Sequence, residues 1–86
     1  MFKLTGTFTF LSLKRGISKS EQPFLCVWLL CDDGSPIQVF LSKSLDVDSC
    51  FSKFSVFSSG DIVSVSFNGV SYSSGLRLSV CDIEYI

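Results

Sequence analysis

Apolar and polar residues alternate along much of this chain, with the period of two that indicates β-strands. In residues 2–10 the even positions are Phe, Leu or Gly, and the odd positions are Lys or Thr. This alternation predicts a long first strand over residues 2–13, because Phe and Thr also favour strands. Gly6 lies inside it and predicts a bulge or sharp bend, which a strand shared between two sides of a barrel needs.

Two further strands are predicted in the first half of the chain. Residues 24–31 are almost continuously apolar, so this strand is buried on both faces or keeps one face for a partner or ligand. Residues 32–35 have turn composition, with Gly34 at a positive φ. The next strand opens at Pro36, with Ile37, Val39 and Leu41 pointing inward and Gln38, Phe40 and Ser42 pointing outward.

The second half of the chain begins without a clear period. The apolar residues of segment 44–57 are irregularly spaced, and we expect a loop with one turn of helix that plugs a barrel. A turn over residues 58–61 and a strand over residues 62–67 follow. Asn68 and Gly69 then form the strongest short hairpin signal in the chain, which favours a type I′ turn.

A last strand is predicted over residues 76–86. Its apolar residues change from even to odd positions, and a bulge near Val80 reconciles the two halves. Five or six strands with short turns predict an all-β fold, a small OB-fold-like barrel of five strands with protruding β-hairpins. With 86 residues the chain is expected to form a single domain over residues 1–86.

The charge is unevenly distributed along the chain. The net charge is −1 and the sequence pI is near 5.0, which argues against a generally basic nucleic-acid binder. Residues 1–20 nevertheless contain four bases and no acid, a charge of +4, whereas residues 21–86 contain three bases and eight acids, a charge of −5. The asymmetry suggests a local positive surface, although chance in a short chain explains it equally well.

The cysteines do not suggest a metal site or an exported protein. There are four cysteines, no histidine and no C-x-x-C pair, so the usual zinc ligands and their spacing are missing. The N-terminus lacks the features of a signal peptide, and the longest apolar run, residues 24–31, is too short to span a bilayer. We therefore expect a cytoplasmic protein with reduced thiols, and without a metal or other cofactor.

Enzymatic activity has little support in the sequence. No histidine is available as a general base, and no glycine-rich phosphate loop occurs. The acids lie mostly in predicted turns, for example Asp32, Asp33 and Asp61, where capping and solubility explain them. We therefore expect a protein without catalytic residues or a small-molecule substrate.

Nucleic-acid binding is favoured by the segment between the first two strands. Single strands are held by a positive groove along the backbone and by aromatic faces on which bases stack. Lys14, Arg15 and Lys19 supply charge around this hairpin tip, residues 14–22, and Phe24 follows at its base. Elsewhere in the chain, Phe40 and Tyr72 are candidates for base stacking. Trp28 could also stack a base, but a position packed in the core is favoured for it. Candidates for phosphate contacts are Lys3, Lys43 and Arg77.

The residues of this hairpin also resemble a known pattern. The chain has Lys14 or Arg15 as the base, followed by Gly16, Ser18, Pro23 and Phe24. This spacing resembles the single-stranded DNA-binding proteins of filamentous bacteriophages, the gene V protein family. In that family the hairpin reads approximately basic-x-Gly-x-Ser-x-x-Gly-x-Pro-aromatic, and Glu21 stands here in place of its second Gly.

Two other segments are similar to the same family. Residues 35–40 are similar to its third strand, with Phe40 at the position of a basic groove residue. Residues 60–78 resemble its protruding hairpin, which makes a two-fold dimer. The resemblance therefore implies a dimer hairpin with Asn68, Gly69 and Tyr72, and Tyr72 would approach the DNA-binding loop of the partner subunit.

The resemblance implies an OB-fold homodimer that coats single-stranded DNA cooperatively with little sequence preference. In that family the coating serves phage DNA replication in the cytoplasm of the infected bacterium. Two alternatives remain open from the sequence. One is an RNA-binding barrel similar to cold-shock proteins, and the other is a small β-barrel that binds another protein through its apolar strand.

Overall fold

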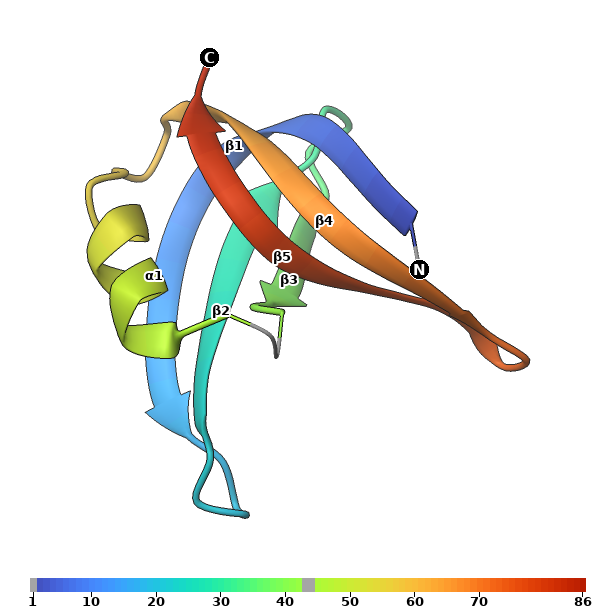
Figure 1. Cartoon of the computed structure of the whole chain (residues 1–86). Coiled ribbons are helices and arrows are strands. Elements are labelled where there is room, and N and C mark those ends of the chain that lie inside the picture. The colour runs from blue at the N-terminus through green and yellow to red at the C-terminus, as the bar shows by residue number, and fades with distance from the viewer. Residues whose placement is uncertain (1, 43–44) are drawn as a thin grey trace.

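The computed structural model describes residues 2–42 and 45–86, and these residues form one antiparallel β-sheet with one short helix (Figure 1). The five strands are arranged in the order β3-β2-β1-β4-β5. The fold is thus mostly β, as the alternation predicts. The elements are β1 (Phe2–Ile17), β2 (Pro23–Leu30), β3 (Pro36–Phe40), α1 (Val47–Phe54), β4 (Ile62–Tyr72) and β5 (Gly75–Tyr85).

Strand β1 is shared between the two halves of the sheet. Its first half pairs with β4 and its second half with β2, and Thr9 has a pairing partner on both sides. The irregularity lies at Leu11, between the paired residues Phe10 and Ser12, and not at Gly6, where we predicted it. Pairing continues regularly through Gly6, because the glycine leaves room for the ring of Phe8, and a Cβ there would lie 2.9 Å from that ring.

Strands β2 and β3 follow the predicted pattern closely. The turn between them has Gly34 at φ +86°, as predicted. Val39 and Leu41 are buried and Phe40 is exposed. Ser42 was predicted to point outward but is buried, because the chain here runs against β5 and the Ser42 N–H donates to the carbonyl of Val80 at 2.8 Å.

Helix α1 is longer than the single turn that the sequence predicted. Its eight residues begin after Asp46, whose carboxylate accepts hydrogen bonds from the N–H and hydroxyl of Ser49 at 3.0 and 2.8 Å. Such an N-cap satisfies a backbone donor that the helix leaves unpaired. The helix lies beside β1 and β2 (Figure 1) and buries Phe54 in the core, whereas the irregular spacing suggested only a loop.

The prediction of a hairpin turn at Asn68-Gly69 is wrong. Both residues lie within β4, where they pair with β1 on one side and with β5 on the other. The turn lies at residues 73–74, between the paired residues Tyr72 and Gly75. Gly69 instead lies under the ring of Phe2, its partner across the sheet, and a Cβ there would lie 2.5 Å from that ring.

The predicted bulge near Val80 is confirmed. Ser66 pairs with Asp82 and the next residue of β4 pairs with Val80, so Cys81 is the extra residue. The bulge returns the odd positions of the last strand to the inner face. The core lies between the sheet and α1 and contains Phe10, Leu25, Val27, Leu29, Val39, Leu41, Phe54, Phe57, Val63, Val65, Phe67, Val80 and Ile83.

Candidate nucleic-acid interface

The β1–β2 hairpin and the β4–β5 hairpin protrude from the sheet in different directions (Figure 1), and a groove of about 1000 Å³ lies between them. Phe24 and Phe40 line the groove on the side of β2 and β3, and we call them the first wall. Tyr72 and Arg77 line it on the side of the β4–β5 hairpin and form the second wall. The floor consists of Leu45, Asp46, Val47 and Asp48.

The first wall is a pair of aromatic rings on one face of the sheet. Phe24 and Phe40 meet edge to face, with 6.0 Å between the ring centroids and 68° between their planes. Phe40 is 48% exposed, whereas Phe24 is half-buried, because its ring lies across Gly16 on β1. A Cβ at Gly16 would lie 2.5 Å from Cζ of Phe24, so the glycine permits this position of the ring.

The strand pairing places Lys14 on the face of the first wall. Cys26 of β2 is opposite Lys14 on one side and opposite Phe40 on the other, and paired residues share a face of a sheet. Lys14 is exposed and has no ion-pair partner within residues 2–42 and 45–86. An unpaired cation therefore lies on the same face as two aromatic rings.

The tip of the β1–β2 hairpin holds Lys19 in solvent. Ser18 organises this turn, because its backbone N–H bonds the carbonyl of Gln22 at 2.8 Å and its carbonyl accepts from Glu21 at 2.9 Å. Glu21 has a φ of +61°, in the left-handed region that favours glycine. Lys19 is exposed and, among the described residues, forms no ion pair.

Arg15 does not lie with the other predicted contacts. It pairs with Leu25, a core residue, so its side chain is on the opposite face of β1 from Lys14. There its guanidinium forms an ion pair with Asp48 and lies 5.6 Å from the centroid of the Phe51 ring. These contacts tie the β1–β2 hairpin to α1 and occupy the charge that the sequence assigned to phosphate binding.

The second wall is more exposed than the first. Tyr72 is 54% exposed at the end of β4, and Arg77 pairs with Val70 on the same face of the hairpin. Arg77 has no ion-pair partner in the described part of the chain. Of the other predicted contacts, Lys3 lies outside this groove, and Lys43 falls outside the described residues.

The groove has a negative floor and, among the described residues, one cation, Arg77, in its lining. The pKa of Asp46 lies below its ordinary value of 3.8 because the side chain and backbone of Ser49 both donate hydrogen bonds to the carboxylate, so this floor residue is ionised at neutral pH. Lys14 and Lys19 lie on the β1–β2 hairpin but, like Lys3, are not among the residues that line the groove.

The acidic floor was missed from the sequence. The segment Asp46-Val47-Asp48-Ser49 suggested a helix start, but nothing local indicated that it would face the basic hairpin. That proximity depends on pairing and packing of residues distant in the chain. In the described part of the chain no helix is long and apolar enough to cross a membrane, and no group of three His, Cys, Asp or Glu residues is arranged to hold a metal ion.

Comparison with protein-family models, with curated protein sequences and with solved structures finds no match to this chain.

Proposed function

We propose that this protein binds single-stranded DNA with little sequence preference, along the groove between its two hairpins. The observation on which the proposal rests is the aromatic pair of the half-buried Phe24 and the exposed Phe40, with the unpaired Lys14 on the same face. Every base has a face that stacks on an aromatic ring, so such a surface tolerates any sequence. The phosphates supply the charge that the lysines attract.

We also propose that the sheet is an OB-fold barrel. A parallel bridge between Leu41 and Val80 supports this, because it brings the end of β3 against β5. The OB-fold is a five-stranded, partly open barrel that binds oligonucleotides on the face of its second and third strands and on the loops after strands 1 and 4. The groove is lined from the corresponding elements, with Phe24 on β2, Phe40 on β3 and Tyr72 beside the β4–β5 turn.

The resemblance to the filamentous phage proteins supports a role in phage DNA replication in a bacterial cytoplasm. Glu21 departs from the family pattern, which has glycine at this point of the hairpin. Its φ of +61° is a conformation that glycine adopts freely, so the backbone here is consistent with the pattern even though the residue differs. Glu21 therefore differs from the family pattern in its side chain and charge, but not in the conformation of its backbone.

A homodimer is part of the proposal, with β4 and β5 contributing the interface. The support is a set of exposed apolar residues on β1 and β5, the two strands that flank β4 in the sheet. Phe2, Leu4 and Leu76 are exposed, and none of them lines the groove. Their pairing partners Gly69, Phe67 and Ser71 lie on one face of β4. A self-complementary apolar surface of this kind is buried in a two-fold dimer. Leu4→Glu with Leu76→Glu should convert a dimer into a monomer in sedimentation experiments.

The central test is a titration with oligo-dT at low salt, followed by fluorescence polarisation of a labelled oligonucleotide and by the fluorescence of Trp28. The tryptophan is four residues from Phe24 on the same face of β2 but does not line the groove, so polarisation is the primary readout and Trp28 fluorescence a secondary one. Phe40→Ala should weaken binding about tenfold or more, since a stacked base contributes roughly 1–3 kcal/mol, and Phe40→Trp should restore it. Absence of binding by the wild-type protein at low salt would refute the proposal.

The same titration separates the alternatives. Competition with an RNA oligomer of equal sequence tests whether the barrel prefers RNA, which would show as displacement of DNA at lower concentrations. A protein-binding module would instead give no oligonucleotide binding, and Lys14→Ala with Lys19→Ala would leave binding of its protein partner intact.

A further inference from the structure

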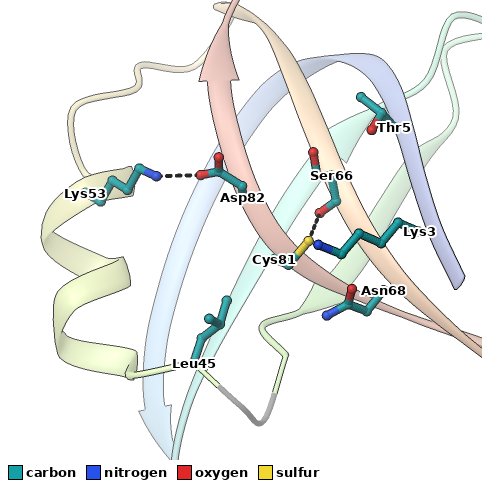
Figure 2. Close-up of a pocket in the computed structure, with 8 residues that line it drawn as sticks. All are labelled: Lys3, Thr5, Leu45, Lys53, Ser66, Asn68, Cys81 and Asp82. Atoms are coloured by element: carbon teal, nitrogen blue, oxygen red, sulfur yellow. Dashed lines mark hydrogen bonds and ion pairs between the residues drawn. The ribbon is translucent and has the colours of Figure 1, made fainter. Parts of the chain in front are cut away.

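A second hollow, of about 560 Å³, lies on the outer face of the sheet beside the groove. Figure 2 shows the side chains that line it, with Lys3, Ser66, Asn68 and Cys81 on one side and Lys53 and Asp82 on the other. Asn68 and Leu45 line both the hollow and the groove. A strand that leaves the groove past these two residues therefore enters the hollow.

The hollow is built from two neighbouring cross-strand pairs. Lys3 pairs with Asn68 and Thr5 pairs with Ser66, and the four side chains share one face of β1 and β4. They bring an ammonium group, an amide and two hydroxyls together, and each of these can donate a hydrogen bond to a phosphate oxygen. Lys3 is exposed and, within the described residues, has no ion-pair partner.

Asn68 provides a separate indication that the hollow takes a ligand. Its Nδ2 donates to Oγ of Ser42 at 3.4 Å, but its Oδ1 is buried and has no hydrogen-bond partner among the described residues. A buried carbonyl oxygen without a donor is rare in folded proteins, and each such atom calls for an explanation. A small rotation of this amide toward a ligand with an N–H group supplies the missing donor.

Lys53 and Asp82 complete the hollow on the side of α1. Lys53 Nζ donates to Oδ1 of Asp82 at 2.6 Å, and this bond joins α1 to β5. The aspartate holds the pKa of Lys53 above its ordinary value, so the lysine stays charged. The carboxylate neutralises Lys53, and the uncompensated positive charge of the hollow is thus that of Lys3.

We propose that this hollow binds one further nucleotide of the DNA strand that occupies the groove, with its phosphate at Lys3, Thr5 and Ser66 and its base near Asn68. The inference rests on the proposed function and extends it, because it lengthens the DNA track from the hairpins onto the outer face of β1 and β4. An oligonucleotide that occupies only the groove is shorter than one that also fills the hollow. The proposal thus predicts how affinity depends on oligonucleotide length.

The test compares Lys3→Gln with the wild type on oligo-dT of about four and about ten nucleotides, which bracket the lower range of site sizes of OB-folds. The variant should bind the longer oligonucleotide about fivefold more weakly, with a salt slope smaller by about 0.7 because one phosphate contact is lost. It should bind the shorter one as the wild type does. Equal effects on both lengths, or none on either, would overturn the inference.

Removal of single hydroxyls provides a matched control. Thr5→Val and Thr7→Val are nearly isosteric changes on the same face of β1, but only Thr5 lines the hollow. Thr5→Val should weaken binding of the longer oligonucleotide about twofold to threefold, and Thr7→Val should leave it unchanged. Similar effects of the two variants would contradict a site in the hollow.

Inorganic phosphate separates a nucleotide subsite from an independent anion site. If phosphate alone shifts the backbone amide signals of Thr5 and Ser66 at millimolar concentration while the longer oligonucleotide does not, the hollow is a separate anion site and the inference is wrong. Shifts that appear with the longer but not the shorter oligonucleotide support it. A wild-type protein that binds neither length contradicts the proposed function itself, which is a different result.

Discussion

The two hairpins that flank the groove are fixed by different interactions. The β1–β2 hairpin is closed by its own turn, where hydrogen bonds within residues 18–22 set the chain path. The β4–β5 hairpin extends past a strong turn signal, Asn68-Gly69, because both residues pair with β1 and β5. Local turn chemistry thus decides where the chain reverses only if no third strand competes for the same backbone groups.

The hairpins also present their aromatic residues differently. Phe24 is held between Gly16 and Phe40, whereas Tyr72 is more than half exposed and forms no aromatic contact within the described residues. The first wall is therefore ordered before a ligand arrives, and the second loses side-chain freedom on binding. Because ordering a side chain opposes binding, the first wall should contribute more affinity for each ring.

The largest expected effect comes from reversing the charge on the two hairpins separately. Lys14→Glu with Lys19→Glu should weaken oligo-dT binding by about 100-fold or more at low salt, which is about tenfold for each charge, and Arg77→Glu by only about threefold. Each reversal replaces a phosphate contact with repulsion, and the strand is held less firmly at the second wall. Polarisation titrations at several salt concentrations measure both. Equal losses of affinity per reversed charge on the two hairpins would show that the first wall does not contribute more to binding than the second.

The two covered glycines allow the first wall to be disturbed without changing a charge. Gly16→Ala pushes the ring of Phe24, which faces the groove, and should weaken binding about fivefold to tenfold if that ring stacks a base. Gly69→Ala pushes the ring of Phe2, which does not line the groove, and is the matched control. Thermal unfolding of both variants provides the stability reference. Similar losses of affinity would contradict a special role for Phe24.

A smaller effect is expected from the ion pair that holds Arg15. Asp48→Asn releases the guanidinium from α1, so Arg15 becomes available to a phosphate, and binding should tighten about threefold with a salt slope steeper by about 0.7. Asp33→Asn removes the same charge from the β2–β3 turn, where the side chain accepts a hydrogen bond from the Ser35 N–H, and serves as control. Equal tightening in both variants would show that the gain in affinity comes from the change in net charge and not from the release of Arg15.

The smallest effect concerns the acid stability of the groove floor. Hydrogen bonds from Ser49 lower the pKa of Asp46, so ionised Asp46 stabilises the fold above its ordinary pKa of 3.8. This contribution disappears as the pH falls toward the lowered pKa of the folded state. Asp46→Asn keeps an acceptor for the helix cap but does not titrate. The difference in melting temperature between wild type and variant should therefore shrink from pH 6 to pH 3, as measured by circular dichroism.

Much of the sheet was predictable because its signals are local. The alternation in β1, the Gly34 turn and the phase change at Val80 each depend on residues within one segment. The bulge was predicted at Gly6 but lies at Leu11, since the glycine receives a neighbouring ring instead. Its position depends on how β1 divides its pairing between β2 and β4, which no single segment encodes.

The candidate site was predictable to a similar degree. The pattern grouped Lys14, Phe24 and Phe40, and strand pairing brings these three residues onto one face. Arg15 was grouped with them by sequence distance, although the period of two puts neighbours on opposite faces. The contact between Arg15 and Asp48 joins two segments more than thirty residues apart, so local reasoning missed it.

The division of β1 between two partners also bears on the order in which the protein folds. The β1–β2 hairpin closes a short loop, so it can form early, and it brings Lys14 and Phe24 together by itself. The first half of β1 must wait for β4, since Phe2 pairs with Gly69 at the far end of the chain. During synthesis all residues of the lysine-bearing hairpin are therefore translated before those of the second wall. We expect the groove to be assembled when β4 and β5 dock on β1, a strand that was translated before them.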